Sequence, residues 1–260
     1  MEGKTLMNNH FILTPYFIDN PEPGLEPLAR PDWQTNKPTL PPGSQQARLI
    51  PLYQPLANFV AETAAQGRRP VSIAGDCVTS LAVLAGLQRA GIHPTLIWFD
   101  AHGDFNTWET TPSGFLGGMP LAMAVGRGEQ TIVDGLGLAP LAEEQVILTD
   151  ARDLDPGERE AVAGSRVTHL PDVEDLLDYT FPDGPLYIHF DSDVLDPAAA
   201  PAMNYPAPGG PPAETLARVF RHLAGSGRIV AVSLSSWAPD LDEDGRTRQT
   251  VMALLETLLS

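Results

Sequence analysis

The chain has 260 residues, of which 43% are hydrophobic and 19% are charged, so it can bury the core of one large α/β domain. Its formal net charge of −17 repels phosphates and anionic lipid headgroups, which argues against binding to nucleic acid or a membrane surface. It contains no run of roughly 18 apolar residues that would span a membrane and no secretory leader pattern, so we expect a cytoplasmic protein. The single cysteine, Cys77, cannot form an intramolecular disulfide, which fits a reducing compartment.

The predicted elements alternate between strands and helices after a proline-rich N-terminal segment. Within residues 1–50, only residues 10–17 predict a strand, either an edge strand or the first strand of the chain. Further along, buried strands are predicted at 71–74, 95–99, 145–149, 186–190 and 229–234. Helices are predicted at 52–66, 78–90, 117–125, 156–163, 213–224 and 246–259, and a long loop at 197–212.

This alternation predicts an α/β fold, a three-layer α/β/α sandwich with a mostly parallel sheet. Strands that are apolar on both faces and separated by helices are typical of parallel sheets with right-handed crossovers. We expect one domain covering residues 1–260, with residues 1–50 packed on it.

Polar clusters follow four of the predicted strands, where ligand sites form in open parallel sheets. The clusters lie at residues 74–77, 100–104, 152–155 and 191–193. Asp100, His102 and Asp104 are spaced by two, as are Asp191 and Asp193. If strand geometry continued through each set, its side chains would project to one side of the sheet.

These five groups predict a metal site. Asp-x-His-x-Asp alone is also typical of a solvated loop or a helix N-terminus, but the second acidic pair favours metal binding. Five such groups repel one another unless cations are bound, and carboxylate and imidazole ligands suit Mn²⁺. Two metals about 3.5–4 Å apart can lower the pKa of a shared water toward neutrality and so supply a hydroxide nucleophile.

Three motifs resemble the signatures of the ureohydrolase superfamily, which includes arginase, agmatinase and formimidoylglutamase. They are Ala74-Gly75-Asp76, the run 100–104 and the run Asp-Ser-Asp-Val-Leu-Asp-Pro at 191–197. The resemblance, which covers about residues 73–239, implies the same sandwich fold and two Mn²⁺ per chain. Asp100 and Asp191 would then bridge the ions. His102, Asp104 and Asp193 would complete the ligands, and Asp104 would also orient the nucleophile.

Cys77 stands where the first motif usually ends in a histidine ligand. A cysteine in such a turn is often a small buried hydrophobe, but this position favours a metal-bound thiolate, whose softer sulfur would reduce the preference for Mn²⁺. Here the chain is similar to a subgroup that hydrolyses hydroxylated arginine. The similarity lies in Cys77, in residues 103–107 and in a His-x-Asp-x-Asp motif at 189–193.

Two further positions differ from arginase. Gly117 takes the place of a histidine thought to shuttle protons, and Ser236 that of a glutamate that holds the guanidinium. His189 is on the same predicted strand face as Asp191, so it is either a replacement acid or base or a core histidine bonded to backbone. Tyr187 is expected in the core.

The resemblance also implies how the amino-acid end of a substrate is bound. Asn106 and Ser113 match positions that bind the substrate α-carboxylate, and Asp155 matches one that reaches the α-ammonium. Asp155, which precedes Pro156, is also a credible helix N-cap. Together these residues favour an α-amino acid over agmatine.

We therefore predict hydrolysis of a C–N bond in a small guanidino substrate, of the arginine or Nω-hydroxyarginine type, to ornithine plus urea or hydroxyurea. The alternatives are another amidino substrate, namely guanidinobutyrate, agmatine or formimidoylglutamate, and a degenerate binding protein without activity. Retention of five acidic and imidazole groups argues against degeneration. A homo-oligomer is expected only by analogy with the family.

Overall fold

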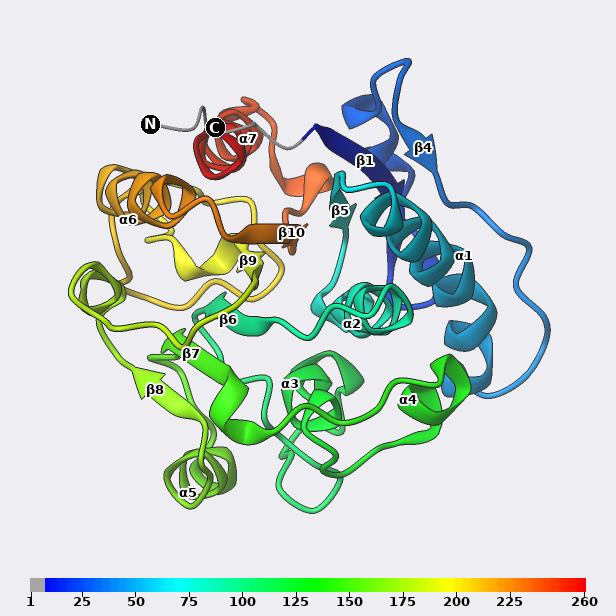
Figure 1. Ribbon diagram of the computed structural model, residues 1–260, viewed down its shortest axis with the longest axis horizontal. Coiled ribbons are helices and arrows are strands. Elements are labelled where there is room, and N and C mark those ends of the chain that lie inside the picture. Colours follow the sequence, from blue (N-terminus) through cyan, green and yellow to red (C-terminus); the bar gives the residue numbers. More distant parts are fainter. Residues whose placement is uncertain (1–7) are drawn as a thin grey trace.

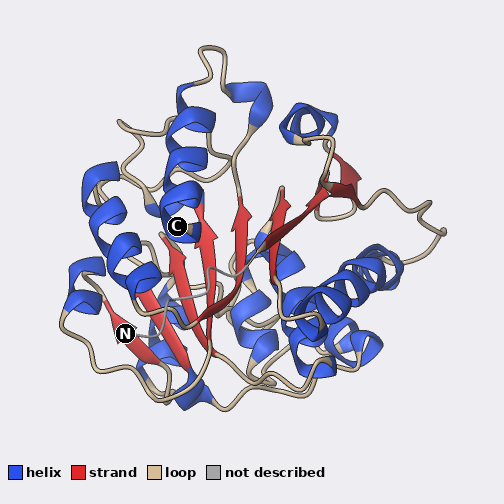
Figure 2. Cartoon of the chain, turned by 45° about the horizontal axis from the view of Figure 1, so that its top comes forward, coloured by secondary structure: helices blue, strands red, loops and turns tan. Residues whose placement is uncertain are grey.

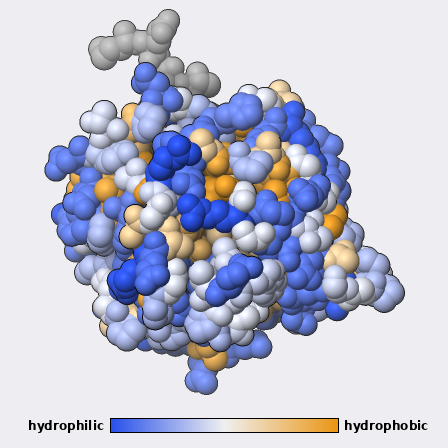
Figure 3. Space-filling model, turned by 90° about the horizontal axis from the view of Figure 1, so that it is seen from below, coloured by the Kyte–Doolittle hydropathy of each residue, from blue (hydrophilic) through white to orange (hydrophobic). Residues whose placement is uncertain are grey.

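The computed structural model describes residues 8–260, which form a central sheet with helices on both faces (Figures 1 and 2). Within this range, no helix combines the length and the apolar character needed to cross a membrane. On the face drawn in Figure 3, hydrophobic residues reach the surface only in small groups among hydrophilic ones.

In the described part of the chain, the main sheet has eight parallel strands in the order β4-β1-β5-β10-β9-β6-β7-β8. Its strands are β1 (Asn9–Thr14), β4 (Gln34–Thr35), β5 (Arg69–Ala74), β6 (Thr95–Asp100), β7 (Val146–Asp150), β8 (Thr168–Leu170), β9 (Leu186–Asp191) and β10 (Ile229–Ser235). A separate antiparallel pair joins β2 (Tyr16–Phe17) and β3 (Asn20–Pro21).

Within residues 8–260, seven α-helices connect and cover the strands, with short 3-10 turns between them. The α-helices are α1 (Gln45–Ala65), α2 (Ser80–Arg89), α3 (Pro120–Ala124), α4 (Thr131–Leu136), α5 (Pro156–Ala163), α6 (Ala213–Gly225) and α7 (Arg246–Leu259). The 3-10 turns are η1 (Pro23–Leu28), η2 (Cys77–Thr79), η3 (Leu116–Gly118), η4 (Glu143–Gln145), η5 (Val173–Leu177), η6 (Ser192–Val194) and η7 (Pro239–Leu241).

Two hydrophobic cores lie on opposite faces of the sheet. Along β6, Leu96 and Trp98 join the core under α1 and α2, whereas Ile97 and Phe99 join the core under α6 and α7. This alternation follows from the two-residue period of a strand. The three-layer α/β/α fold predicted from the sequence is thereby confirmed.

All five predicted inner strands are present, each within a residue or two of its predicted bounds. The strand predicted at 10–17 is β1 followed by β2, and β1 lies between β4 and β5 rather than at the edge. The N-terminal segment therefore contributes two strands to the main sheet.

Helix α1 begins at Gln45, seven residues before its predicted start. Pro51 and Pro55 lie inside it, and proline normally interrupts a helix because it lacks a donor and clashes with the preceding turn. Ser44 caps the helix by accepting a hydrogen bond from the Ala47 amide at 3.3 Å. The packing of α1 against α2 and α4 keeps this stretch helical despite both prolines.

Candidate active site

A cavity of about 370 Å³ opens at the carboxyl edge of the sheet, where the polar clusters were predicted to meet. Its wall comes from strand ends and loops that are far apart in the sequence. It is lined by Phe17, Asp76, Cys77, Asp100, His102, Asp104, Asn106, Thr111, Ser113, Phe115, Gly117, Gly118, Asp153, Asp155, Glu158, Asp191, Asp193, Tyr205 and Ser236. Of the predicted site residues, His189 alone does not line it.

Asp100 is the last residue of β6, and the chain turns immediately after it. The His102 amide donates to Asp100 Oδ1 at 2.7 Å, which holds the turn. His102 Nδ1 lies 3.3 Å from Asp100 Oδ1 and 3.1 Å from Asp193 Oδ2. The condition that strand geometry continues to Asp104 is not met, because β6 ends at Asp100, and a turn brings these side chains together instead.

The same construction occurs at the end of β9. Asp191 ends the strand, and its Oδ1 accepts the Asp193 amide at 2.8 Å as η6 begins. Asp193 Oδ1 accepts the Ala101 amide at 3.1 Å. The two strand ends are therefore tied to each other by a carboxylate that also faces His102.

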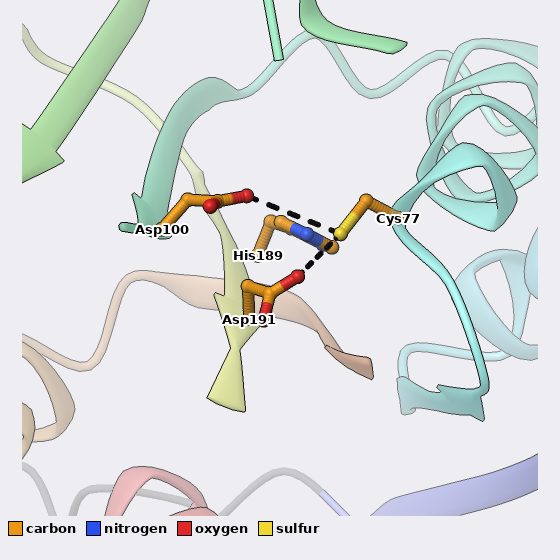
Figure 4. Close-up of side chains that lie close together, drawn as sticks. All are labelled: Cys77, Asp100, His189 and Asp191. Carbon is orange, nitrogen blue, oxygen red and sulfur yellow. Dashed lines mark hydrogen bonds between the residues drawn. The ribbon is translucent and has the colours of Figure 1, made fainter. Parts of the chain in front are cut away.

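Cys77 begins η2, directly after the capping residue Asp76. Its Sγ lies 2.6 Å from Asp191 Oδ2 and 4.0 Å from Asp100 Oδ2 (Figure 4). It also lies 3.1 Å from Ser235 Oγ. Cys77 is buried, but its thiol faces acidic side chains at the cavity. This placement is unlike that of a cysteine packed only among apolar groups.

Asp104 has a backbone φ of 49°, a conformation that is strained for a residue other than glycine. Its side chain is buried and lines the cavity, yet Oδ2 has no hydrogen-bond partner in the structure. An unpaired buried carboxylate oxygen is costly. Such an atom fits a cation ligand or a proton acceptor.

When no cation is present, burial shifts the carboxylates of the site toward their protonated forms. Burial raises the pKa of Asp191 to about 7, with repulsion from Asp193 adding to the effect. Burial, together with the charges of Asp100 and Asp191, raises the pKa of Asp104 well above its usual range. Bound cations would remove this penalty.

The pKa values of His102 and Cys77 are both raised, but for different reasons. Burial acts to lower the pKa of His102, but hydrogen bonds to Asp100 and Asp193 prevail and raise that pKa to about 12. Burial raises the pKa of the Cys77 thiol, and the Asp191 charge adds to this rise. Without a cation, His102 is thus a protonated partner for the carboxylates.

Metal-donor atoms fall into two groups within residues 8–260. The first contains Cys77, Asp100, His189 and Asp191, and the second contains Asp100, His102 and Asp193. In each group the donor atoms lie within 4.8 Å of one another. Asp100 belongs to both groups, and the unpaired Oδ2 of Asp104 lies in the wall of the same cavity. The residues present therefore fit two neighbouring divalent cations.

The predicted substrate-binding residues also meet at this cavity. Asn106 Nδ2 donates to Asp155 Oδ2 at 3.0 Å, and Asn106 Oδ1 accepts from Thr110 Oγ1 at 2.9 Å. Asp155 occupies the N-cap position of α5, but its side chain faces Asn106. Ser113 is exposed at the mouth and accepts the Phe115 amide at 3.2 Å.

Glu158 is a cavity residue that the sequence analysis missed. Its carboxylate accepts the Phe105 amide at 2.8 Å and the Asp155 amide at 3.2 Å, and burial raises its pKa to about 7. Gly103 permits this placement, because a Cβ there would lie 2.7 Å from Glu158 Cδ. The sequence did offer one signal for Glu158. It lies in the first turn of α5, three residues after Asp155, so the two side chains lie on the same side of the helix.

Gly117 lies beside an aromatic group that was also missed. A Cβ at Gly117 would lie 2.3 Å from the Phe115 ring, so Phe115 fills the space of any side chain there. The Phe115 ring stacks on Phe17 at a centroid distance of 6.1 Å and meets the half-exposed Tyr205 at 5.2 Å. The absence of a side chain at Gly117 thus makes room for Phe115, which forms an aromatic wall at the mouth of the cavity with Phe17 and Tyr205.

Ser236 directs its hydroxyl inward, donating to Asp191 Oδ2, with a backbone φ of 68°.

His189 is fully buried, and its Nδ1 lies 2.7 Å from Ser233 Oγ. Burial lowers the pKa of His189 to about 3, so the ring is neutral. The cavity wall does not include His189, so the geometry gives no support for direct proton exchange between His189 and a substrate.

This fold, with its acidic and imidazole donors gathered beyond parallel strand ends, defines the class of arginase-like hydrolases. The model of the Arginase family matches residues 34–260, and the chain therefore belongs to that family of ureohydrolases, enzymes acting on C–N bonds. The resemblance noted in the sequence is confirmed.

Two curated relatives illustrate the range of activity in the family. The arginase of Bacillus subtilis (strain 168) is 33% identical over 216 residues, covering 78% of this chain and 73% of the relative. The N(omega)-hydroxy-L-arginine amidinohydrolase of Streptomyces lavendulae is 36% identical over 190 residues, covering 72% of this chain and 66% of the relative.

Solved structures share the fold over almost the whole chain. Bacillus caldovelox arginase superposes with a TM-score of 0.84 at 24% identity and covers 98% of both chains. Bacillus subtilis arginase gives a TM-score of 0.82 at 27% identity, covering 97% of this chain and 98% of that one.

Proposed function

We propose that the chain is a binuclear Mn²⁺-dependent hydrolase of a guanidino amino acid, with Nω-hydroxyarginine and arginine as the candidate substrates. The products would be ornithine plus hydroxyurea or urea. The observation that carries this proposal is the convergence of two donor groups on Asp100, beside a cavity that also contains Asn106, Ser113 and Asp155.

In this proposal Asp100 and Asp191 would contribute to holding both ions. His102 and Asp193 would hold one of them, and Cys77 and Asp104 would hold the other. When bound, a pair of divalent cations lowers the pKa of a shared water toward neutrality and stabilises developing negative charge. The protein supplies the order of the donors, because backbone amides of residues 101, 102 and 193 fix the carboxylates.

The remaining cavity residues would bind and orient the substrate. Asn106 and Ser113 bind its α-carboxylate, and Asp155 receives its α-ammonium. Asp104, through the unpaired Oδ2, carries a proton from the nucleophile toward the leaving amine. The acidic cleft also attracts a cationic guanidinium group.

Three features of this cavity depart from the arginase pattern and weaken the case for arginine relative to Nω-hydroxyarginine. Cys77 replaces the usual histidine, Ser236 offers a hydroxyl where arginase uses a glutamate, and Phe115 occupies the space beside Gly117. The relative from Streptomyces lavendulae, 36% identical, is named for hydroxyarginine hydrolysis.

The test is a substrate panel with the Mn²⁺-loaded protein, scored by chromatography for urea, for hydroxyurea and, with formimidoylglutamate, for formamide. The panel contains arginine, Nω-hydroxyarginine, agmatine, guanidinobutyrate and formimidoylglutamate. We expect Nω-hydroxyarginine to give ornithine together with hydroxyurea. Its kcat/KM should be higher than the kcat/KM for arginine. Turnover of agmatine or guanidinobutyrate alone would refute the assignment of an α-amino acid, and no turnover of any member would favour the degenerate binding protein.

The proposal also covers the cellular location and the oligomeric state of the protein. A single cysteine and a net charge of −17 support action in the cytoplasm, away from nucleic acid and membranes. A homo-oligomer is proposed by analogy with the family. Light scattering of the purified chain would measure it.

A further inference from the structure

We propose that His189 is itself a metal ligand, binding through Nε2 to the ion that Cys77, Asp100 and Asp191 also hold. This inference rests on the proposed metal-dependent function. It replaces the sequence-based idea that His189 is an acid or base, and it gives each of the two ions one imidazole, because His102 belongs to the other group.

The four donor side chains surround one small volume. Figure 4 shows Cys77, Asp100, His189 and Asp191 pointing toward one another from three different segments of the chain. Their donor atoms all lie within 4.8 Å of one another. Ligand bonds of about 2.0–2.3 Å place donors on opposite sides of an ion at most about 4.6 Å apart, so this spacing is that of one coordination shell after small adjustments.

Nδ1 of the His189 ring is already engaged, which leaves Nε2 for the metal. It lies 2.7 Å from Ser233 Oγ, and that hydroxyl in turn lies 2.7 Å from the Tyr187 hydroxyl. Histidines that bind metals normally donate their second ring nitrogen to a protein acceptor, which fixes the tautomer. Ser233 is positioned to be that acceptor.

Trp98 fixes the ring plane. Its indole lies over the His189 ring at a centroid distance of 3.8 Å, and its Nε1 donates to Asp100 Oδ2 at 3.1 Å. One side chain therefore positions both an imidazole and a carboxylate of the same donor group. A histidine that served only as core packing would not need this second link.

Nε2 has no good hydrogen bond within residues 8–260. Its one partner there is Ser235 Oγ at 3.5 Å, beyond the usual range for such bonds. The same hydroxyl lies 3.1 Å from Cys77 Sγ and 3.3 Å from Asp191 Oδ2, so Nε2 faces the centre of the donor group. A buried ring nitrogen in this position gains a partner when a cation binds.

The chemistry of the donor set supports the assignment. One thiolate, one imidazole and two carboxylates form a mixed set that Zn²⁺ and Co²⁺ accept as readily as Mn²⁺. Cys77 stands where the family motif has an imidazole, and His189 supplies an imidazole to the same donor group from β9. The sulfur thus does not have to hold the ion with carboxylates alone.

The experiment uses the full-length chain. It counts the imidazoles on bound Zn²⁺ by extended X-ray absorption fine structure and measures the Zn²⁺ affinity by calorimetry. Wild type should show about one imidazole per ion, because His102 and His189 are shared between two ions. His189→Gln should halve that count and weaken one site by about 100-fold or more. His169→Gln, which changes a half-buried histidine of β8, is the matched control and should alter neither quantity.

The alternatives have distinct outcomes. A wild-type count of about half an imidazole per ion, or an unchanged count in His189→Gln, would show that His189 is a core residue while leaving the proposed function intact. A wild-type chain that binds no zinc would defeat both proposals. If His189→Gln does not fold, Ser233→Ala retains the ring and removes its orienting partner. It should then weaken one site by about 10–100-fold, and unchanged affinity would overturn the inference.

Discussion

Asp100 and Asp191 are single residues on which both proposed ions depend. Each ends a central strand, and each is buried within reach of several other donors. We expect Asp100→Ala and Asp191→Ala each to lower activity by about 10³-fold or more, because a bridging carboxylate serves both ions. Metal content by mass spectrometry should fall with activity. Asp183→Ala, at an exposed loop position, is the control, and full activity in either bridging variant would rule out a shared centre.

Cys77 allows a second prediction at this scale. If its sulfur is a ligand, Cys77→His should raise the Mn²⁺ affinity, because imidazole suits that ion better than thiolate. The contact of 2.6 Å with Asp191 supports this outcome. Calorimetric Mn²⁺ titration of both proteins is the measurement. Unchanged affinity with a loss of about 1–3 kcal/mol in the free energy of unfolding would instead show an overpacked core position.

Residue patterns predicted the acidic and imidazole groups that meet at the cavity, because strand ends of a parallel sheet share one edge. They could not predict Phe115 and Tyr205, since an aromatic residue in a loop has no periodicity that reveals its contacts. The position of Ser235 among three donors was missed for a related reason. It depends on the register between β9 and β10, which strand sequences alone do not specify.

At the scale of elements, the turn after β9 and the long loop near residue 207 are held by one arginine. Arg152 donates to the carbonyls of Asp193 and Leu195 at 3.1 and 3.4 Å and to that of Ala207 at 3.0 Å. It also pairs with the buried Asp150. The guanidinium therefore fixes the backbone that carries Asp193.

Arg152→Ala should lower the free energy of unfolding by about 3–5 kcal/mol, because it leaves a buried charge and several carbonyls without a partner. Metal affinity should fall by about 10-fold, since the loop of Asp193 loses its anchor. Urea unfolding and calorimetry measure the two effects. Arg166→Ala removes an exposed arginine as a control, and an effect no larger than that control would contradict the anchoring role.

The inner strands were predictable because each is a continuous apolar run buried on both faces. The short elements were not. β4 is a two-residue strand and β8 a three-residue one, while α4 has six residues, so none is long enough to show a period. Helix α1 shows the opposite case, in which tertiary packing overrides a local proline signal.

At the scale of the whole molecule, the metal-free protein should become less stable as the pH rises through neutrality. The pKa values of Asp191 and Glu158 are raised to about 7, so their contribution is complete below about pH 4 and is lost as the pH rises through 7. His102, with its pKa raised to about 12, acts in the same direction above about pH 6.5. His189, whose pKa is lowered to about 3, opposes this trend only below about pH 6.5.

Urea unfolding of the chelated protein at about pH 6.5 and about pH 8.5 measures this effect. We expect a lower free energy of unfolding at the higher pH, and a smaller difference once Mn²⁺ is present, because cations stabilise the ionised carboxylates. Equal or greater stability at the higher pH without metal would contradict the raised pKa values of Asp191, Glu158 and His102.

The central claim is that this cavity holds two metal ions on which activity, but not the fold, depends. The two cores lie on the faces of the sheet and are formed by apolar side chains, so chelation should leave the far-ultraviolet circular dichroism intact. The most direct measurement is a calorimetric titration of the metal-free chain with Mn²⁺. We predict saturation at about two ions per chain, with hydrolysis restored as they bind. A folded chain that binds no Mn²⁺, or that is fully active without added metal after chelation, would contradict the account.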